Sequence, residues 1–192
     1  MQAKLFRREV LPFLLAFVAL GFAALFADAL LHVFGLAWVG RWLGIPGTLL
    51  ILLSFGYSLR KRGQIRTGRP TAWLVAHQAM AWFGSLLILV HAGIHFNAIL
   101  AWLAVGAMAV DVGSGLTGKF LLERSRKRLL DAQQRLRALG LSAEELEEQL
   151  YRDSLTFDVM KRWRAVHLPI TLAFAVLALV HIVAVFLFWG WK

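Results

Sequence analysis

The hydrophobic residues of this chain fall into five long runs, and most of the charged residues lie between the runs. A helix that crosses the hydrocarbon core of a membrane needs about 20 mostly apolar residues, whereas a helix of a soluble domain carries only an apolar stripe. The pattern therefore predicts one membrane-spanning helix for each run. The predicted spans are residues 11–34, 43–59, 72–95, 98–118 and 166–189, of which the second is the shortest.

The composition agrees with this prediction, because 59% of the 192 residues are hydrophobic and the mean hydropathy is +0.67. The basic start MQAKLFRREV is similar to the beginning of a signal peptide. The apolar run that follows is longer than the roughly 7–15 residues of a signal-peptide core, and no small-residue cleavage site stands out. We expect the first span to be a retained helix.

Positive charge is divided unequally between the two sides that five spans define. Of the 21 Lys and Arg residues, three precede the first span, five lie in 60–69 and eleven in 119–164, which leaves only Arg41 and Lys192 for the other side. Such an excess marks the cytoplasmic side of a membrane protein. We expect a multi-pass protein of the bacterial cytoplasmic membrane with a cytoplasmic N-terminus. The net charge of +10 then reflects topology and not nucleic-acid binding.

The segment between the fourth and fifth spans is expected to form a cytoplasmic helical hairpin. LLERSRKRLLDAQQRLRALG predicts a basic helix that stops at Gly140, and Ser142 opens a capping box for an acidic second helix. The hairpin is either a solvated connector or a docking surface for a partner. The predicted fold is therefore an all-α membrane protein, a five-helix transmembrane bundle with helices 1–4 in 1–118, the hairpin in 119–163 and helix 5 in 164–192.

Four of the six histidines occur in two motifs of equal length: HQAMAWFGSLLILVH, with His77 and His91, and HLPITLAFAVLALVH, with His167 and His181. Fourteen residues at about 100° each come close to four full turns, so the two histidines of a motif face nearly the same way, roughly 21 Å apart. One span separates the two motif helices, so both helices run in the same direction. His77 should then be level with His167, and His91 with His181.

Two facing pairs of imidazoles at two depths are what two bis-histidine haems require, because a low-spin haem takes one axial nitrogen from each side of its ring. The chain contains no cysteine, which excludes disulfides, thiolate-bound iron–sulfur clusters and covalently attached c-type haem. Single membrane histidines more often bond across helices or line an ion path. A histidine-based metal-ion or proton transporter without haem is therefore the alternative function.

On these two motifs, and on the block WRAVHLPITLAFAVLALVH, the chain resembles the dihaem b-type membrane cytochromes. These include the cytochrome b core of quinol-oxidising complexes, hydrogenase-type cytochrome b and ferric-reductase-like domains. The resemblance covers the helices at 72–95 and 166–189. It implies two haem b groups and electron transfer across the bilayer between the quinone pool and a partner subunit of a respiratory complex, such as an iron–sulfur or multihaem protein. No motif such as G-x-G-x-x-G for flavin or nicotinamide is present, so we expect an electron-transfer subunit and not a complete reductase.

Residues around the motifs are candidates for contacts with haem. Gly84 lies midway between the histidines of the first motif, where glycine would let a porphyrin edge approach the backbone or would allow close helix packing. Phe174 is the corresponding residue of the second motif. Arg164, one turn before the second motif, is a candidate partner for a haem propionate, with Arg162 and Arg69 in reserve, and it also fits the positive-inside pattern.

Four more polar residues are candidates for a quinone or proton site. His32 follows Asp28 by four residues near the outer end of the first span, so the two either exchange protons in a quinone reaction or form an interfacial pair in water. His95, at the outer rim, would bind a propionate, contact a quinone or replace His91 as a ligand. Asp111, within the fourth span, is expected to pair with a basic group or to line a polar cavity.

Overall fold

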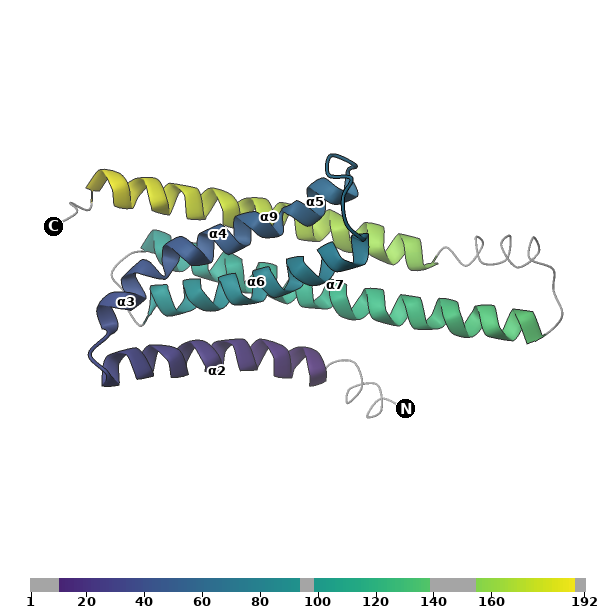
Figure 1. Cartoon of the computed structure of the whole chain (residues 1–192), viewed down its shortest axis with the longest axis horizontal. Helices are drawn as coiled ribbons and strands as arrows, with labels where there is room; N and C mark the ends of the chain where they lie inside the picture. The colour runs from purple at the N-terminus through teal and green to yellow at the C-terminus, as the bar shows by residue number, and fades with distance from the viewer. Residues whose placement is uncertain (1–10, 94–98, 139–154, 189–192) are drawn as a thin grey trace.

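The computed structural model describes residues 11–93, 99–138 and 155–188, and these ranges are almost entirely α-helical (Figure 1). The helices are α2 (Leu11–Val33), α3 (Ala37–Trp42), α4 (Gly44–Ser54), α5 (Gly56–Lys61), α6 (Pro70–Ala92), α7 (Ile99–Ala138) and α9 (Leu155–Phe188). No strand occurs within the described ranges. The predicted all-α fold class is confirmed.

Five segments in the described part of the chain are long and apolar enough to cross a membrane, as the sequence predicts. They are Leu14–Val33, Ala37–Lys61, Pro70–Ala92, Ile99–Phe120 and Arg162–Phe188. Their outer surfaces carry large apolar side chains, such as Phe22, which is 71% exposed, and Leu172, which is 66% exposed. A surface of this kind is stable in lipid and not in water. The chain is a multi-pass membrane protein.

The second span differs from its prediction. It covers Ala37–Lys61, with 25 residues, and is not the shortest. The charge of Arg41 interrupts the apolar pattern, so the pattern placed the start of the span too late in the chain. The span consists of α3, α4 and α5, which meet at Leu43 and Phe55, and both junction residues keep helical dihedral angles. Their amides donate to carbonyls three residues earlier, as in a 3₁₀ turn.

Helices α2, α6 and α9 run in one direction, whereas α7 and the α3–α5 segment run in the other (Figure 1). One end of the bundle therefore holds the start of α2, the loop between α5 and α6 and the approach to the last span. We call it the basic end, because it carries the basic residues of 60–69 together with Arg162 and Arg164. The opposite end is called the far end. The two motif helices, α6 and α9, are parallel, as expected.

The predicted cytoplasmic hairpin lies only partly within the described residues. Helix α7 continues well past its membrane span to Ala138, in line with the predicted basic helix, and projects from the basic end (Figure 1). Helix α9 begins at Leu155, before the last span. The acidic second helix, predicted from Ser142 onward, falls within residues 139–154, outside the described residues. The hairpin therefore stays a prediction.

The bundle contains two closely packed helix pairs, α4 with α6 and α7 with α9, and α2 packs against α6. Glycines make the first crossing possible: a Cβ atom at Gly84 would lie 3.0 Å from the carbonyl oxygen of Gly47 and 2.8 Å from Cγ1 of Ile51. In the second pair, the ring of Trp163 occupies the space that a side chain at Gly118 would need. Small residues are the usual means by which membrane helices approach each other closely.

Replacing Gly84 with Ala should destabilise the protein by about 1–3 kcal/mol, because the added methyl group overpacks the α4–α6 crossing. Gly106→Ala is the matched control, since nothing lies within 4 Å of a Cβ atom at that position in the described structure. The measurement is thermal unfolding of the purified variants in detergent. Equal unfolding temperatures for the two variants would contradict the close crossing.

Candidate functional site

The four motif histidines lie on α6 and α9, two on each helix, and all four are partly buried. His77 and His167 lie close enough for a charge on one ring to affect the other, and the same holds for His91 and His181. The helices are parallel, so the first pair lies toward the basic end and the second toward the far end (Figure 1). We call them the inner pair and the outer pair. The structure thus brings together the same residues that the sequence predicts to face each other.

The histidines of α6 are held by backbone carbonyls of the second span. Nδ1 of His77 lies 3.0 Å from the carbonyl oxygen of Ser54, and Nδ1 of His91 lies 3.3 Å from that of Gly40. The ring of His91 also lies over Gly44, where a Cβ atom would come within 2.8 Å of Cδ2 of the ring. The histidines can be recognised in the sequence, but neither of these two carbonyls can.

The carbonyls are accessible because the second span is broken into short helices. In a continuous α-helix the carbonyl oxygen of Ser54 would accept the amide of Ser58. That amide instead donates to the carbonyl oxygen of Phe55, at 2.8 Å, which leaves Ser54 to accept the imidazole. Gly40 lies beside the other break, where its carbonyl oxygen also accepts the amide of Leu43 in a tightened turn.

The spacing of the two carbonyls matches that of the histidines. Gly40 and Ser54 are fourteen residues apart, as are His77 and His91, and the two segments run antiparallel. Equal spacing keeps both contacts in one register, with the Gly84 crossing midway between them. The equal interval is present in the sequence. However, its meaning depends on the two helix breaks, which the apolar pattern does not reveal.

These carbonyl contacts decide which ring nitrogen is available. A carbonyl oxygen only accepts, so Nδ1 of His77 and of His91 must carry the hydrogen. In the neutral imidazole, Nε2 then keeps its lone pair. An imidazole held by Nδ1 and presenting the lone pair of Nε2 is the form in which histidine binds a metal.

His167 has a different set of partners, and they come from α7. Its Nδ1 lies 3.1 Å from Oγ of Ser114 and 3.4 Å from Oδ1 of Asp111. The ring of Trp163 stacks on the imidazole, with 4.8 Å between centroids and 17° between planes. The hydroxyl of Thr171 donates to Oδ1 of Asp111 at 2.6 Å. These contacts fix both the imidazole and the carboxylate.

Asp111 was expected to pair with a basic group or to line a polar cavity, and the partners found in the structure are His167 and Thr171. The sequence contains the relevant spacing, since Ser114 is three residues after Asp111 and Thr171 is four after His167. Such intervals place each couple on one helix face. The antiparallel register of α7 and α9, which brings the couples together, could not be obtained from either helix alone.

Gly84 lies in the α4–α6 crossing. Of the two roles considered for it, close helix packing is the one that the structure shows, and the space for a Cβ atom is taken by α4. Phe174, its counterpart on α9, is buried, with 7% of its surface exposed.

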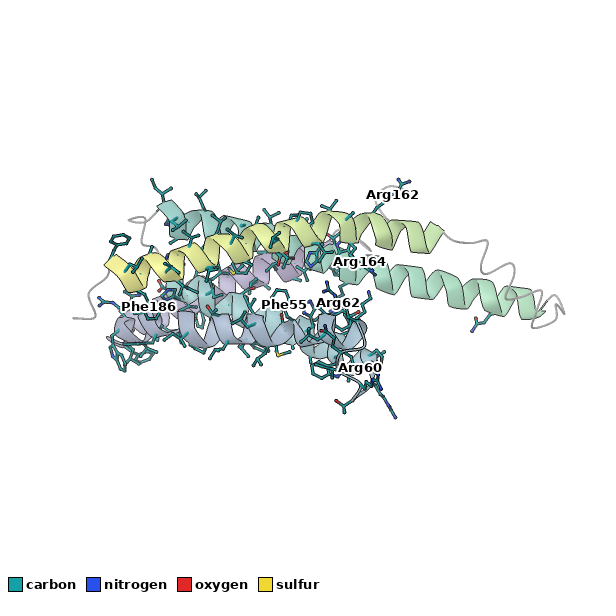
Figure 2. The ribbon with its side chains drawn as sticks, turned by 90° about the horizontal axis from the view of Figure 1, so that it is seen from above. Phe55, Arg60, Arg62, Arg162, Arg164 and Phe186 are labelled. Carbon is teal, nitrogen blue, oxygen red and sulfur yellow. The ribbon has the colours of Figure 1, made fainter. Side chains whose placement is uncertain are left out.

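Arg164, the candidate for a propionate contact, is exposed at the basic end and lies within electrostatic range of Lys61. Figure 2 shows Arg62 and Arg164 toward this end of the bundle, whereas Arg162 points away from the helices. Arg69, the other reserve, occupies the N-cap position of α6, and its side chain makes no capping hydrogen bond. Two cations close together at a membrane surface favour an anionic group between them.

Asp28 and His32 form a pair on α2 near the far end. Asp28 is 8% exposed, and its Oδ2 lies 3.6 Å from Nδ1 of His32, which is itself exposed. The same nitrogen lies 2.9 Å from the main-chain carbonyl oxygen of Asp28. Asp28 is also the one charged residue in the lining of a cavity of about 220 Å³ between α2, α6 and α7. Leu89 and Ala92, which flank His91 in the sequence, line the same cavity. His95 lies outside the described residues.

Among the described residues, no group of three or more His, Cys, Asp or Glu side chains is arranged to hold a metal ion. Comparison of the chain with protein families, with curated proteins and with solved structures gave no match. A function must therefore be inferred from the geometry of the histidine pairs and their neighbours.

Replacing Thr171 with Val should destabilise the protein by about 1–2 kcal/mol, because the carboxylate of Asp111 loses its hydroxyl donor between α7 and α9. Thr117→Val is the control, since that exposed hydroxyl bonds only within α7, to the carbonyl oxygen of Gly113. Unfolding by heat in detergent distinguishes the two. If both variants unfold at the wild-type temperature, the Thr171 contact contributes nothing.

Proposed function

We propose that this chain is a dihaem b-type cytochrome subunit that carries electrons across a membrane between the quinone pool and a partner redox protein. The observation that carries the proposal is the presence of two histidine pairs at two depths, between parallel helices. A bis-histidine haem needs an axial nitrogen on each face of its ring. When bound, haem supplies reversible one-electron chemistry at the iron.

The surroundings of the pairs suit such a cofactor. Helix α6 packs mainly on α4, and α9 packs mainly on α7, while α6 and α9 do not pack closely on each other in the described structure. The imidazoles of each pair lie close enough to affect each other's charge, although their two helices do not pack directly together. His77 and His91 are held by Nδ1, which leaves Nε2 as the ligand atom.

The charges at the basic end support the position of the inner haem. Lys61 and Arg164 lie near each other on the same end as His77 and His167. Haem propionates would supply the negative charge that offsets their repulsion, and Arg side chains are well suited to carboxylates. We therefore propose Arg164 as a propionate partner. Gly84 is not a proposed porphyrin contact, because α4 occupies the space beside it.

The geometry favours haem over a transported metal ion. A protein site for a metal ion needs three or four side-chain ligands, and the described residues contain no such group. A haem brings four nitrogens of its own and needs only two from the protein. Each histidine pair supplies the two ligands that a haem needs, but not the three or four that a metal-ion site needs.

The cavity beside α2 is the proposed position of a quinone head-group. Its lining is apolar apart from Asp28, and the segment of α6 that lines it also carries His91. Asp28 and His32 would accept or return the protons that accompany quinone oxidation and reduction. An apolar pocket with one proton-exchanging pair suits a lipid-soluble quinone.

The distribution of charge supports a bacterial cytoplasmic membrane with the basic end, the N-terminus and the hairpin on the cytoplasmic side. The partner would be an iron–sulfur or multihaem protein of the same respiratory complex. The long extension of α7 beyond the membrane offers a surface at which a cytoplasmic partner could dock.

Purified protein should be red, with a reduced-minus-oxidised spectrum of b-type haem and one haem for each histidine pair. His77→Ala or His167→Ala should remove one haem, and His91→Ala or His181→Ala the other, because each variant loses an axial ligand. His32→Ala is the control and should keep both. A colourless pure wild-type protein would favour the transporter function instead.

Asp28→Asn should slow reduction of the haems by a short-chain quinol by a factor of about 10²–10⁴, the usual contribution of a general base. Reduction by dithionite, which needs no proton acceptor in the cavity, should be unchanged. Asp131→Asn, on the part of α7 outside the membrane span, is the matched control. Equal quinol rates for the wild type and Asp28→Asn would remove the cavity from the proposal.

A further inference from the structure

The two histidine pairs are not held in the same way. The α6 histidines of both pairs contact neutral backbone carbonyls, those of Ser54 and Gly40. The α9 histidine of the inner pair, His167, instead lies against the carboxylate of Asp111. The inner pair therefore carries a fixed acidic group beside one of its ligand rings.

Asp111 is well fixed in this position. Its Oδ1 receives the hydroxyl of Thr171 at 2.6 Å and lies 3.4 Å from Nδ1 of His167. Oγ of Ser114 lies 3.1 Å from the same nitrogen, so the imidazole meets two polar groups of α7 on its Nδ1 side. Trp163 stacks on the ring face and donates to the carbonyl oxygen of Ser114 at 2.8 Å.

We infer that Asp111 is a positioning residue that lowers the reduction potential of the inner haem below that of the outer haem. This inference rests on the proposed function. A carboxylate beside Nδ1 increases the electron density that Nε2 donates to iron, which stabilises the ferric form. The effect is strong here, because the low dielectric of a membrane interior screens the charge poorly.

A purely structural role is the competing explanation, since Asp111 also ties α7 to α9 through Thr171. The two explanations predict different effects on the inner potential when the charge of Asp111 is removed. If Asp111 acts through its charge, a neutral side chain of the same shape must raise the inner potential even when the fold is intact. If it only ties the helices together, any loosening of the tie should have a similar effect.

The test is a potentiometric titration of the full-length protein with both haems, followed by visible absorption. The inner haem is identified in an His91→Ala background, which keeps only the inner pair. Asp111→Asn should change the inner reduction equilibrium at least tenfold, which raises the potential by about 59 mV for a one-electron couple. The outer potential should not move. Asp111→Glu should keep the inner potential low.

Thr171→Val is the control for structure, because it loosens the same tie but keeps the charge, and it should not raise the inner potential. The wild type supplies a measurement that needs no Asp111 variant: the inner potential should be the lower of the two. Equal potentials, the opposite order, or an inner potential unmoved by Asp111→Asn would overturn the inference while haem binding stands. Absence of haem from the wild type would instead overturn the proposed function.

Discussion

Lipid cannot form hydrogen bonds, so every polar group within the membrane needs a partner inside the protein, and the structure depends on this constraint. The ring nitrogens of His77 and His91 use carbonyls of the second span, and that of His167 uses α7. Each partner contacts Nδ1 of its imidazole, and Nε2 is the nitrogen that the proposed haem iron would bind. The need to satisfy polar groups therefore also orients three of the four proposed ligands, His77, His91 and His167.

The second span shows how backbone geometry serves this purpose. Its division into α3, α4 and α5 changes the hydrogen-bonding ladder next to Gly40 and Ser54, and these carbonyls contact the two histidines of α6. The equal intervals along both segments, with Gly47 against Gly84 halfway, make the α4–α6 pair a rigid support. A mostly apolar segment without a motif thus positions half of the proposed ligands.

The sequence predicted the five spans and the parallel direction of α6 and α9, because long apolar runs and their number are local properties. It did not predict the start of the second span, where Arg41 interrupts the apolar pattern. It also could not decide between helix packing and a porphyrin contact for Gly84, because the answer depends on Gly47 of another helix. The partner of Asp111 was also missed, since it follows from the register between α7 and α9. Contacts between helices are set by packing, which single-helix patterns do not contain.

In the proposed function, each histidine pair would bind one haem iron through an imidazole on each face of the porphyrin. Electron paramagnetic resonance of the oxidised, purified protein tests this most directly, because the signal reports the axial ligands of ferric iron. We expect low-spin ferric signals typical of two imidazole ligands, in two distinguishable sets of equal weight. High-spin iron, a single set of signals, or the absence of any haem signal would contradict it.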